Sequence, residues 1–424
     1  MTTPPTLRRT STHRRRADQT TMRRINLSLV LRHLREDGPA SRARIATATG
    51  LNKATVSSLV AELVRRGLVT DGGIDRKGAV GRPGRVVELA GRGICGVGVE
   101  VNVDYVCVLA LDLRDDVLYE RRRALDVGSL PVEAVLDEVA GLVTDAFAEL
   151  ARCGAVPAGV TVAVPGTVDI EAGNVRVSAN LRWRDVGIAD AVLERLGRTD
   201  VPVGAGNDAN LSALAEHAMG VAAGTAELAC LVGSAGVGCG VISGGRLLRG
   251  STGFAGEIGH TPLDVQGRPC GCGRRGCWET AVGLRGLLRL ATGPGDPLRD
   301  PALDLAGRLT TLRERAESGD RRTLDALAQL GTAVGVGAGI VVNLVNPQVL
   351  VLGGYFAAFT PYLHDALMAE LRARAVAPDA AGCRVVASTL GFTAAARGGA
   401  HAALDRVLHD PSLASRTRPR EVDA

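Results

Sequence analysis

The sequence is poor in aromatic residues and lacks an apolar run long enough to cross a membrane. Phe, Trp and Tyr make up 3% of the 424 residues, so the core must be built mainly from Ala, Val and Leu. Gly, Arg or Asp interrupts each apolar stretch before it reaches the roughly 20 residues that span a bilayer. The basic N-terminus is not followed by the apolar segment and cleavage site of a secretory signal. These absences predict a cytoplasmic protein with no membrane partner.

The chain also lacks a disulfide framework and has almost no lysine. Six of the nine cysteines are scattered without a regular spacing. The two lysines, Lys53 and Lys77, both lie within the first 85 residues. Those residues hold 18 Lys and Arg against 6 Asp and Glu, a balance of +12, and residues 86–424 hold 32 against 39, a balance of −7. A basic head on an acidic body predicts a polyanion partner for the head alone.

The other three cysteines fall within eight residues and follow a histidine. His260, Cys270, Cys272 and Cys277 stand at offsets of 0, 10, 12 and 17. Three thiolates and one imidazole are the ligand set of a closed, tetrahedral structural zinc site. We therefore predict that these residues bind a structural Zn²⁺ within a loop over residues 257–279. The alternative is a cysteine-rich turn without a metal.

Residues 23–90 have the pattern of a winged helix-turn-helix domain. A first helix is expected to stop at Gly38-Pro39, and Ser41 and Asn52 are candidate N-caps of two further helices. The first helix is expected to bury Ile25, Leu29, Leu31 and Leu34. The third helix is expected to bury Val56, Leu59, Val60, Leu63 and Val64. Two short strands around a Gly- and Arg-rich hairpin at 75–85 would form the wing.

The expected DNA contacts come from the start of the third helix and from the wing. A recognition helix presents its N-terminal residues to the major groove, and wing cations reach phosphates or the minor groove. The candidates are Asn52, Lys53, Thr55, Ser57, Ser58, Arg76, Lys77, Arg82 and Arg85. A three-helix packing module with no role in nucleic-acid binding is the alternative. Residues 1–22 have no apolar period and are expected to form a disordered basic tail.

Residues 91–410 alternate between strand and helix patterns. A strand–turn–strand pattern begins the body at 94–113 and recurs at 228–242, and each is followed by helices and further strands. This doubling predicts an α/β domain of two lobes with an actin-like architecture and a ligand cleft between the lobes. Residues 411–424 are expected to be a flexible tail.

The motifs of residues 23–405 resemble those of the ROK family of repressors, open reading frames and sugar kinases. The resemblance rests on Pro165-Gly166, Asn207-Asp208, the glycine turn at 233–240, and above all on the sequences around Glu257–His260 and Cys270–Glu279. It implies a two-lobed sugar-kinase type (ribonuclease H-like) domain. The N-terminal helix-turn-helix places the chain with the transcriptional regulators of that family.

The resemblance also implies a set of sugar-binding residues. They are Asn207, Asp208, Glu257, His260 and Glu279, with Asn180 as a further candidate. The chemistry agrees, because carboxylates accept the adjacent hydroxyls of a sugar through charge-assisted hydrogen bonds. His260 can bind zinc through one ring nitrogen and donate to a hydroxyl from the other. Solvated acids on a metal loop are the alternative.

The sequence argues against catalysis. Family kinases have an Asp-x-Gly-Gly-Thr-Lys type loop that cradles ATP phosphates, whereas residues 100–105 here read Glu-Val-Asn-Val-Asp-Tyr. Both glycines and the threonine are absent, and Asp104 adds a carboxylate that would repel a triphosphate. Asp208 occupies the position of the kinase general base, but a base is insufficient without a phosphoryl donor held in line. We therefore expect no catalytic residue, although the second glycine turn leaves weak nucleotide binding open.

These observations predict a sugar-responsive transcriptional regulator, most simply a repressor. Its partners would be operator DNA and a monosaccharide or sugar derivative as effector, and it would act as a homodimer or tetramer with a hinge near residues 90–93. The rivals are an ATP-dependent sugar kinase with an attached DNA-binding domain, and a DNA-binding protein with a vestigial cleft.

Overall fold

The computed structural model describes residues 19–74, 85–300, 303–376 and 382–414, and the chain divides into two compact units. The first unit comprises Met1–Glu88 and Val407–Ala424, and the second comprises Leu89–Arg406. The C-terminal segment was expected to end the large domain at residue 410 and continue as a separate tail. The described part of this segment, residues 407–414, groups with the first unit. The candidate contacts Arg76, Lys77 and Arg82 lie outside the described residues, as does the tail over 1–18.

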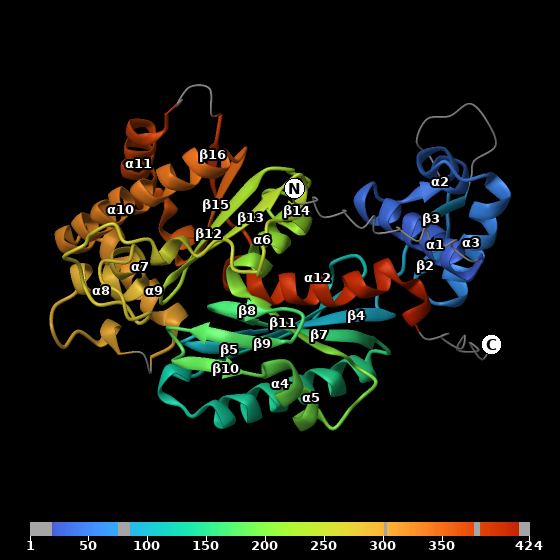
Figure 1. The fold of residues 1–424 in the computed structure, drawn as a ribbon, viewed down its shortest axis with the longest axis horizontal. Coiled ribbons are helices and arrows are strands. Elements are labelled where there is room, and N and C mark those ends of the chain that lie inside the picture. The colour runs from blue at the N-terminus through green and yellow to red at the C-terminus, as the bar shows by residue number, and fades with distance from the viewer. Residues whose placement is uncertain (1–18, 75–84, 301–302, 377–381, 415–424) are drawn as a thin grey trace, which may run out of the picture. The chain divides into compact units, whose positions relative to one another are not determined.

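The first unit is a three-helix domain with a small sheet (Figure 1). Its β3 lies between β1 and β2. The side chain of Ser41 accepts a hydrogen bond from the Arg44 N–H, and that of Asn52 accepts one from the Thr55 N–H, which confirms both predicted N-caps. The elements are α1 (Gln19–Glu36), β1 (Ala40–Ser41), α2 (Arg42–Thr49), α3 (Lys53–Arg65), β2 (Val69–Ile74) and β3 (Arg85–Leu89).

Helix α1 differs from its prediction in extent and in buried face. It begins at Gln19, inside the segment expected to be disordered. Ile25 and Leu29 are 50% and 39% exposed, so these two expected core positions were wrong. On α3, Val64 is likewise exposed, whereas the other four expected positions are buried. The buried residues of α1 are Leu27, Ser28, Val30, Leu31 and Leu34.

The second unit contains two five-stranded sheets with the same beginning. In the first sheet β4 pairs antiparallel with β5 and parallel with β7, and the strand order is β11-β7-β4-β5-β6. In the second sheet β12 pairs antiparallel with β13 and parallel with β15, and the order is β14-β13-β12-β15-β16. This repetition confirms the predicted doubled α/β architecture, and we call the parts built on these sheets the first and second lobes.

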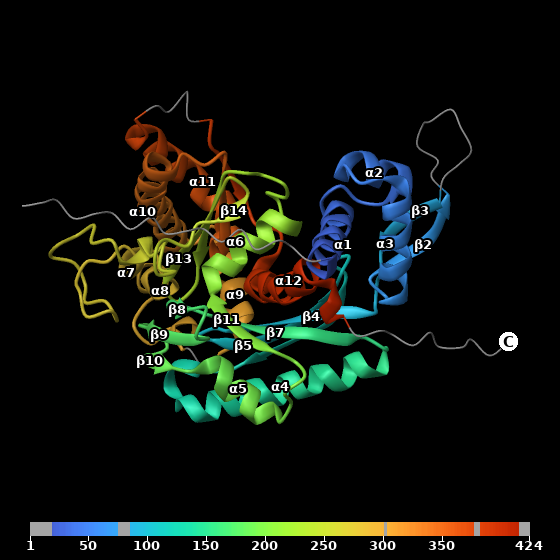
Figure 2. The same ribbon diagram turned by 45° about the vertical axis from the view of Figure 1, so that its right-hand side comes forward.

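The first lobe is a layered structure. Helices α4 and α5 lie on one side of its sheet and α12 lies on the other, as Figure 1 and Figure 2 show. Its elements are β4 (Ile94–Val101), β5 (Tyr105–Asp112), β6 (Val117–Ala124), η1 (Val127–Ser129), α4 (Val132–Arg152), β7 (Val156–Val164), β8 (Thr167–Asp169), β9 (Asn174–Ser178), β10 (Trp183–Val186), α5 (Ile188–Leu196) and β11 (Val203–Asn207).

The second lobe carries the segment of the predicted metal ligands and the longest described helix, α10. Its strands are β12 (Leu228–Gly233), β13 (Val237–Ser243), β14 (Arg246–Leu247), β15 (Val349–Gly354) and β16 (Arg384–Ala387). Its helices are α6 (Asp208–Met219), η2 (Ile258–His260), α7 (Glu279–Val282), α8 (Leu284–Ala291), η3 (Pro297–Arg299), α9 (Leu305–Glu317), α10 (Arg321–Val345), α11 (Tyr355–Arg374) and η4 (Gly391–Thr393). Then α12 (Ala394–His409) and η5 (Pro411–Leu413) end the described chain.

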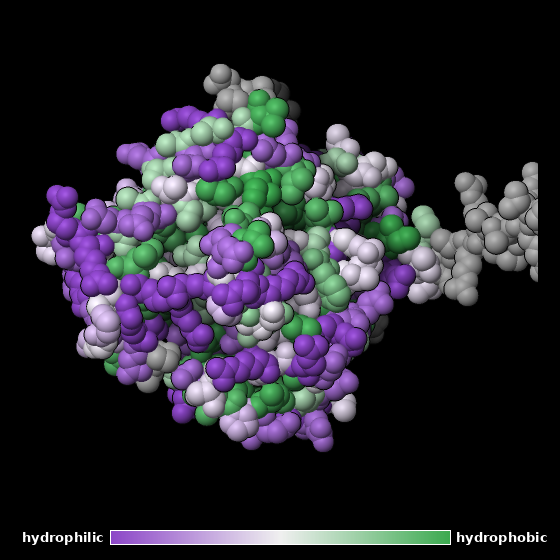
Figure 3. Space-filling model, turned by 60° about the vertical axis from the view of Figure 1, so that its left-hand side comes forward, coloured by the Kyte–Doolittle hydropathy of each residue, from purple (hydrophilic) through white to green (hydrophobic). Residues whose placement is uncertain are grey.

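Helix α10 is the one described helix that is long and apolar enough to cross a membrane, but its packing is that of a core helix. Half of its most apolar 18-residue stretch is buried inside the protein. A Cβ added at Gly331 would lie 2.6 Å from the Leu363 carbonyl oxygen of α11, so the two helices approach more closely than a side chain would allow. Figure 3 shows broad hydrophilic areas on one face of the molecule, with smaller apolar areas between them.

Candidate functional site

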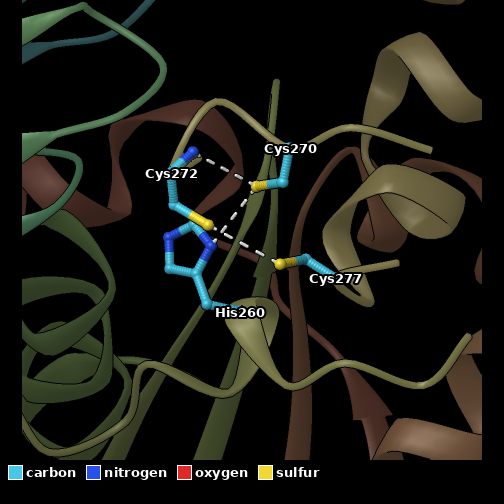
Figure 4. A group of neighbouring side chains, drawn as sticks. All are labelled: His260, Cys270, Cys272 and Cys277. Atoms are coloured by element: carbon cyan, nitrogen blue, oxygen red, sulfur yellow. Dashed lines mark hydrogen bonds between the residues drawn. The ribbon is translucent and has the colours of Figure 1, made fainter. Parts of the chain in front are cut away.

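The four predicted metal ligands lie together in the second lobe (Figure 4). Their ligand atoms are all within 4.8 Å of one another. The Cys272 and Cys277 sulfurs are 3.6 Å apart, and the Cys270 sulfur is 3.6 Å from His260 Nδ1. Zinc bonds of about 2.3 Å to sulfur in a tetrahedron place two sulfurs about 3.8 Å apart. These two distances are thus close to those of a tetrahedral zinc site, and the four residues could hold a metal ion.

The loop that carries these ligands is fastened to α10. The indole Nε1 of Trp278, directly after Cys277, donates to the Ala333 carbonyl at 2.8 Å. The ring lies so close to Gly337 that a Cβ there would come within 2.1 Å of it. Trp278 is almost fully buried as a result. The C-terminal end of the loop is thus held against a long helix independently of the metal ligands.

All six predicted sugar-binding residues line one pocket beside the cluster. They come from the first lobe (Asn180), from the β11–α6 junction (Asn207 and Asp208), and from the two ends of the loop (Glu257, His260 and Glu279). His260 joins the two sites, because its Nδ1 faces the Cys270 sulfur and its Nε2 lies 3.8 Å from the Glu257 carboxylate. The histidine can therefore bind a metal on one side and face the pocket on the other.

Close backbone packing brings Asn180 and Glu279 together across this pocket. The Asn180 side-chain amide donates to the Glu279 carboxylate at 3.4 Å. A Cβ at Gly236 would lie 2.2 Å from that carboxylate, so a side chain there would displace Glu279 from its present position. Asn207 is used structurally, because it donates to the Gly166 carbonyl and caps α6 by accepting from the Asn210 N–H. Its contribution to the pocket is to fix the Pro165-Gly166 turn.

The pocket concentrates carboxylates without a matching cation among its lining residues. Burial raises the pKa of Asp208 to about 6. Burial, together with the carboxylates of Asp208 and Glu279, raises the pKa of Glu257 to about 7, and water screens part of this effect because 34% of the side chain is exposed. Several carboxylates buried together in one pocket favour a ligand that brings several hydroxyl donors.

The sequence reasoning missed Ser178. Its hydroxyl lines the pocket, is buried and has no hydrogen-bond partner among the described residues. A buried hydroxyl without a partner is costly, so a ligand that supplies one would be favoured. The available signal was its position at the end of β9, two residues before Asn180.

The candidate DNA-binding residues that the structure describes differ in their exposure and in their hydrogen bonds. Lys53 and Ser57 are exposed on the N-terminal half of α3, and Arg85 is exposed at the start of β3. Asn52 uses its side-chain oxygen as the helix cap. Ser58 accepts a hydrogen bond from Arg23 of α1 at 3.3 Å. Thr55 is half-buried.

Comparison with known protein families finds one match in the second unit and another in the first. The model of the ROK family matches residues 96–406, and that of the MarR family matches residues 28–77. The chain belongs to the ROK family. It is 30% identical to the xylose repressor of Bacillus subtilis over 393 residues, which cover 92% of this chain and 98% of the relative. It is 28% identical to the N-acetylglucosamine repressor of Escherichia coli O157:H7 over 341 residues, or 78% of this chain and 81% of the relative.

Solved structures show the same ROK fold. A ROK family transcriptional regulator, described as a homologue of the E. coli MLC protein, superimposes with a TM-score of 0.74 at 23% identity and covers 92% of this chain and 98% of its own. A ROK glucokinase from Streptomyces griseus, solved with glucose and AMPPNP, superimposes with a TM-score of 0.64 at 25% identity and covers 73% of this chain and 99% of its own. Repressors and kinases thus share the fold.

In this ROK domain, side chains fill the turn between β4 and β5. The Glu100 carboxylate accepts hydrogen bonds from the Tyr105 hydroxyl at 2.7 Å and from the Asn102 amide at 2.9 Å. All three side chains are buried. Burial raises the pKa of Glu100 to about 7. This turn therefore presents a hydrogen-bonded cluster of buried side chains.

Asp104 behaves differently from the prediction. Its carboxylate is buried and pairs with the Arg308 guanidinium of α9 at 3.1 Å. The Arg308 charge therefore weakens the repulsion that we expected a free Asp104 to exert on a triphosphate. Asp104 is thus not the unpaired carboxylate that the sequence suggested.

Proposed function

We propose that the protein is a sugar-responsive transcriptional repressor that binds operator DNA through α3 and its wing and a monosaccharide or sugar derivative in the ROK pocket. The observation that carries the proposal is the grouping of Asp208, Glu257 and Glu279 around one pocket, in a chain that also has a helix-turn-helix domain. The names of the repressor relatives make xylose and N-acetylglucosamine the first sugars to test.

The metal in this proposal is a structural Zn²⁺ held by His260 and the three cysteines. The sulfur spacing and the set of three thiolates with one imidazole support zinc. When bound, it would fix the loop that ends in Glu257 and Glu279, while His260 keeps Nε2 directed toward the pocket. The metal would take no part in a reaction.

Two features support a coupling of sugar binding to the DNA-binding unit. The chain passes between the units after Glu88, and α12 begins in the second unit and ends in the first. Within the first unit, Arg66 donates to the carbonyls of Ser412 and Ala414, and Arg24 pairs with Asp410. A movement of α12 would therefore be passed, through the residues that follow it, to Arg24 of α1 and to Arg66 at the end of α3, alongside the expected hinge at residues 90–93.

A homodimer or tetramer would present two such domains to a pseudo-palindromic operator. Met22, Ile25 and Leu29 support self-association, because they form an exposed apolar stripe on α1 at spacings of three and four residues. Shifting DNA occupancy from about 99:1 to 1:99 requires roughly 5.5 kcal/mol of differential affinity, or about 2.7 kcal/mol from each of two sugar sites. The proposed compartment is the cytoplasm, where the operator is.

Operator release in a sugar panel tests the proposal. Fluorescence anisotropy of a labelled operator fragment, selected from genomic DNA with the full-length protein, should fall when one sugar is added. Calorimetry should show that the same sugar binds the protein. Operator binding that no sugar alters would support the vestigial cleft instead.

The rival ATP-dependent sugar kinase retains one supporting feature, the second glycine turn near Gly236. We propose that the protein is not an enzyme, because Glu100, Asn102 and Tyr105 close the turn where the phosphates would lie. A coupled assay with ATP and a hexose and pentose panel checks this directly. Robust turnover would overturn the interpretation of that turn.

A further inference from the structure

A second cavity in the ROK domain is lined by arginines and shares no lining residue with the sugar pocket. Its volume is about 280 Å³, close to the lower end of ligand-binding pockets. Of its nine lining residues, four are arginines, four are apolar and one is the carboxylate Asp104. The arginines are Arg285 and Arg289 of α8, Arg299 of η3 and Arg308 of α9.

The cavity has an excess of positive charge. Arg308 and Asp104 form a buried pair at 3.1 Å, with side chains 5% and 6% exposed, so one guanidinium is neutralised and three are not. Burial, followed by the nearby charges of Arg268, Arg299 and Arg285, lowers the pKa of Arg289. These guanidinium groups therefore repel one another across the cavity.

Backbone carbonyls hold the guanidinium groups in place. Arg299 donates to the carbonyls of Thr292 at 2.6 Å and of Arg289 at 3.1 Å, Arg289 donates to that of Thr280 at 2.7 Å, and Arg308 donates to that of Leu298 at 2.9 Å. Each guanidinium has five N–H groups, so donors remain for a ligand. Arg285 has no hydrogen-bond or ion-pair partner among the described residues.

The arrangement differs from a solvated basic surface. Cations on a surface gain by spreading apart, whereas these four line one cavity, and backbone carbonyls hold three of them in place. The remaining wall is apolar and includes Leu284 and Leu288. We propose that this cavity binds a phosphate ester, with its phosphate held by Arg285, Arg289 and Arg299 and its organic part against the two leucines. The site is independent of the proposed sugar site.

Ligand binding there would act on a contact between the lobes. Asp104 lies on the turn between β4 and β5 in the first lobe, and Arg308 lies on α9 in the second. A phosphate group in the cavity competes with the Asp104 carboxylate for Arg308 and repels it. Occupancy of the cavity therefore weakens one buried ion pair that joins the lobes.

Calorimetry of the full-length protein tests the site, with phenyl phosphate and inorganic phosphate as probes and phenol as the uncharged control. We expect saturable binding of phenyl phosphate at one site per chain, weaker binding of inorganic phosphate, and none of phenol at the same concentration. Phenyl phosphate does not resemble a monosaccharide, so the sugar pocket does not contribute. Failure to saturate below about 10 mM would overturn the proposal.

Substitutions assign the binding to this cavity. Arg285 is exposed, so the Arg285→Gln variant should fold normally. It should bind phenyl phosphate about tenfold or more weakly than the wild type. Asp104→Asn should strengthen binding, because it removes the internal competitor. The matched control is Arg313→Gln, at an exposed position on α9 outside the cavity, which should bind like the wild type.

The outcomes separate this site from other basic regions and from the sugar site. Undiminished binding by Arg285→Gln would place the phosphate elsewhere, for example on the DNA-binding unit, and would refute the assignment. Weaker binding by Asp104→Asn would refute the competition. Sugar binding by Arg285→Gln should equal that of the wild type, so a failure of the proposed sugar function would be seen independently of this result.

Discussion

Replacing Glu100 with Gln should stabilise the ROK domain increasingly as the pH rises. The glutamine oxygen can accept both hydrogen bonds that Tyr105 and Asn102 donate to Glu100, so the cluster keeps its geometry. The substitution removes the charge and replaces the other carboxylate oxygen with an NH2 group, whose effect on stability does not depend on pH. Burial raises the pKa of Glu100 from 4.5 to about 7 in the folded state, so the folded protein binds its proton more tightly than the unfolded chain does.

The sign and size of the effect follow from this shift. A carboxyl group with a raised pKa costs no stability below its unfolded pKa, costs progressively more between the two values, and costs a constant amount above the folded pKa. A rise from 4.5 to about 7 corresponds to a full cost of about 3 kcal/mol. Between pH 5.5 and 8.5 the difference in unfolding free energy between Glu100→Gln and the wild type should grow by about 2 kcal/mol.

Urea unfolding followed by tryptophan fluorescence measures this difference. Both tryptophans, Trp183 and Trp278, lie in the second unit, so the signal reports the ROK domain and not the DNA-binding unit. Glu171→Gln, at an exposed position between β8 and β9, should show no pH-dependent difference. A difference for Glu100→Gln that stays flat across this range would refute the rise in the pKa of Glu100 that burial causes.

Three further substitutions test the other sites. Cys272→Ala should lose about one equivalent of zinc per chain, measured by elemental analysis, and should lose the sugar response with it. The control variant Cys230→Ala, in β12, should keep both. A normal sugar response in the absence of zinc would show that the metal does not organise the pocket. Lys53→Ala should weaken operator binding and reduce its salt slope by about one, and an unchanged slope would argue against a phosphate contact. Asp208→Asn should weaken sugar binding by about tenfold or more in calorimetry while the zinc content stays normal.

The sequence predicted the features that depend on local spacing. The metal ligands and the two acids beside them fall within 23 residues, from Glu257 to Glu279, so their motif is visible without a fold. The N-caps Ser41 and Asn52 were predicted for the same reason. The prediction of the buried face of α1 was partly wrong, because two overlapping apolar stripes are possible in that helix and only packing selects between them.

Features formed by distant residues were not visible in the sequence. Asp104 was interpreted as a free carboxylate because its partner, Arg308, is 204 residues away and stands in a helix that local patterns do not orient. The arginine cavity was missed for this reason too, since η3 and α9 supply two of its four guanidinium groups. Ser178 is an ordinary strand residue until the second lobe closes a pocket over it.

The proposed function would let the loop over residues 257–279 organise a sugar sensor without a phosphoryl donor. Glu257 and Glu279 stand at the two ends of the loop, and His260 lies between them, 3.8 Å from one carboxylate and 3.4 Å from the other. A metal bound to His260 would therefore fix the spacing of the two acids that we propose a sugar bridges. Sugar recognition of this kind would require nothing from the β4–β5 turn, where Glu100, Asn102 and Tyr105 form their hydrogen-bonded cluster. On this proposal, recognition would not depend on the part of the domain that a phosphoryl donor would need.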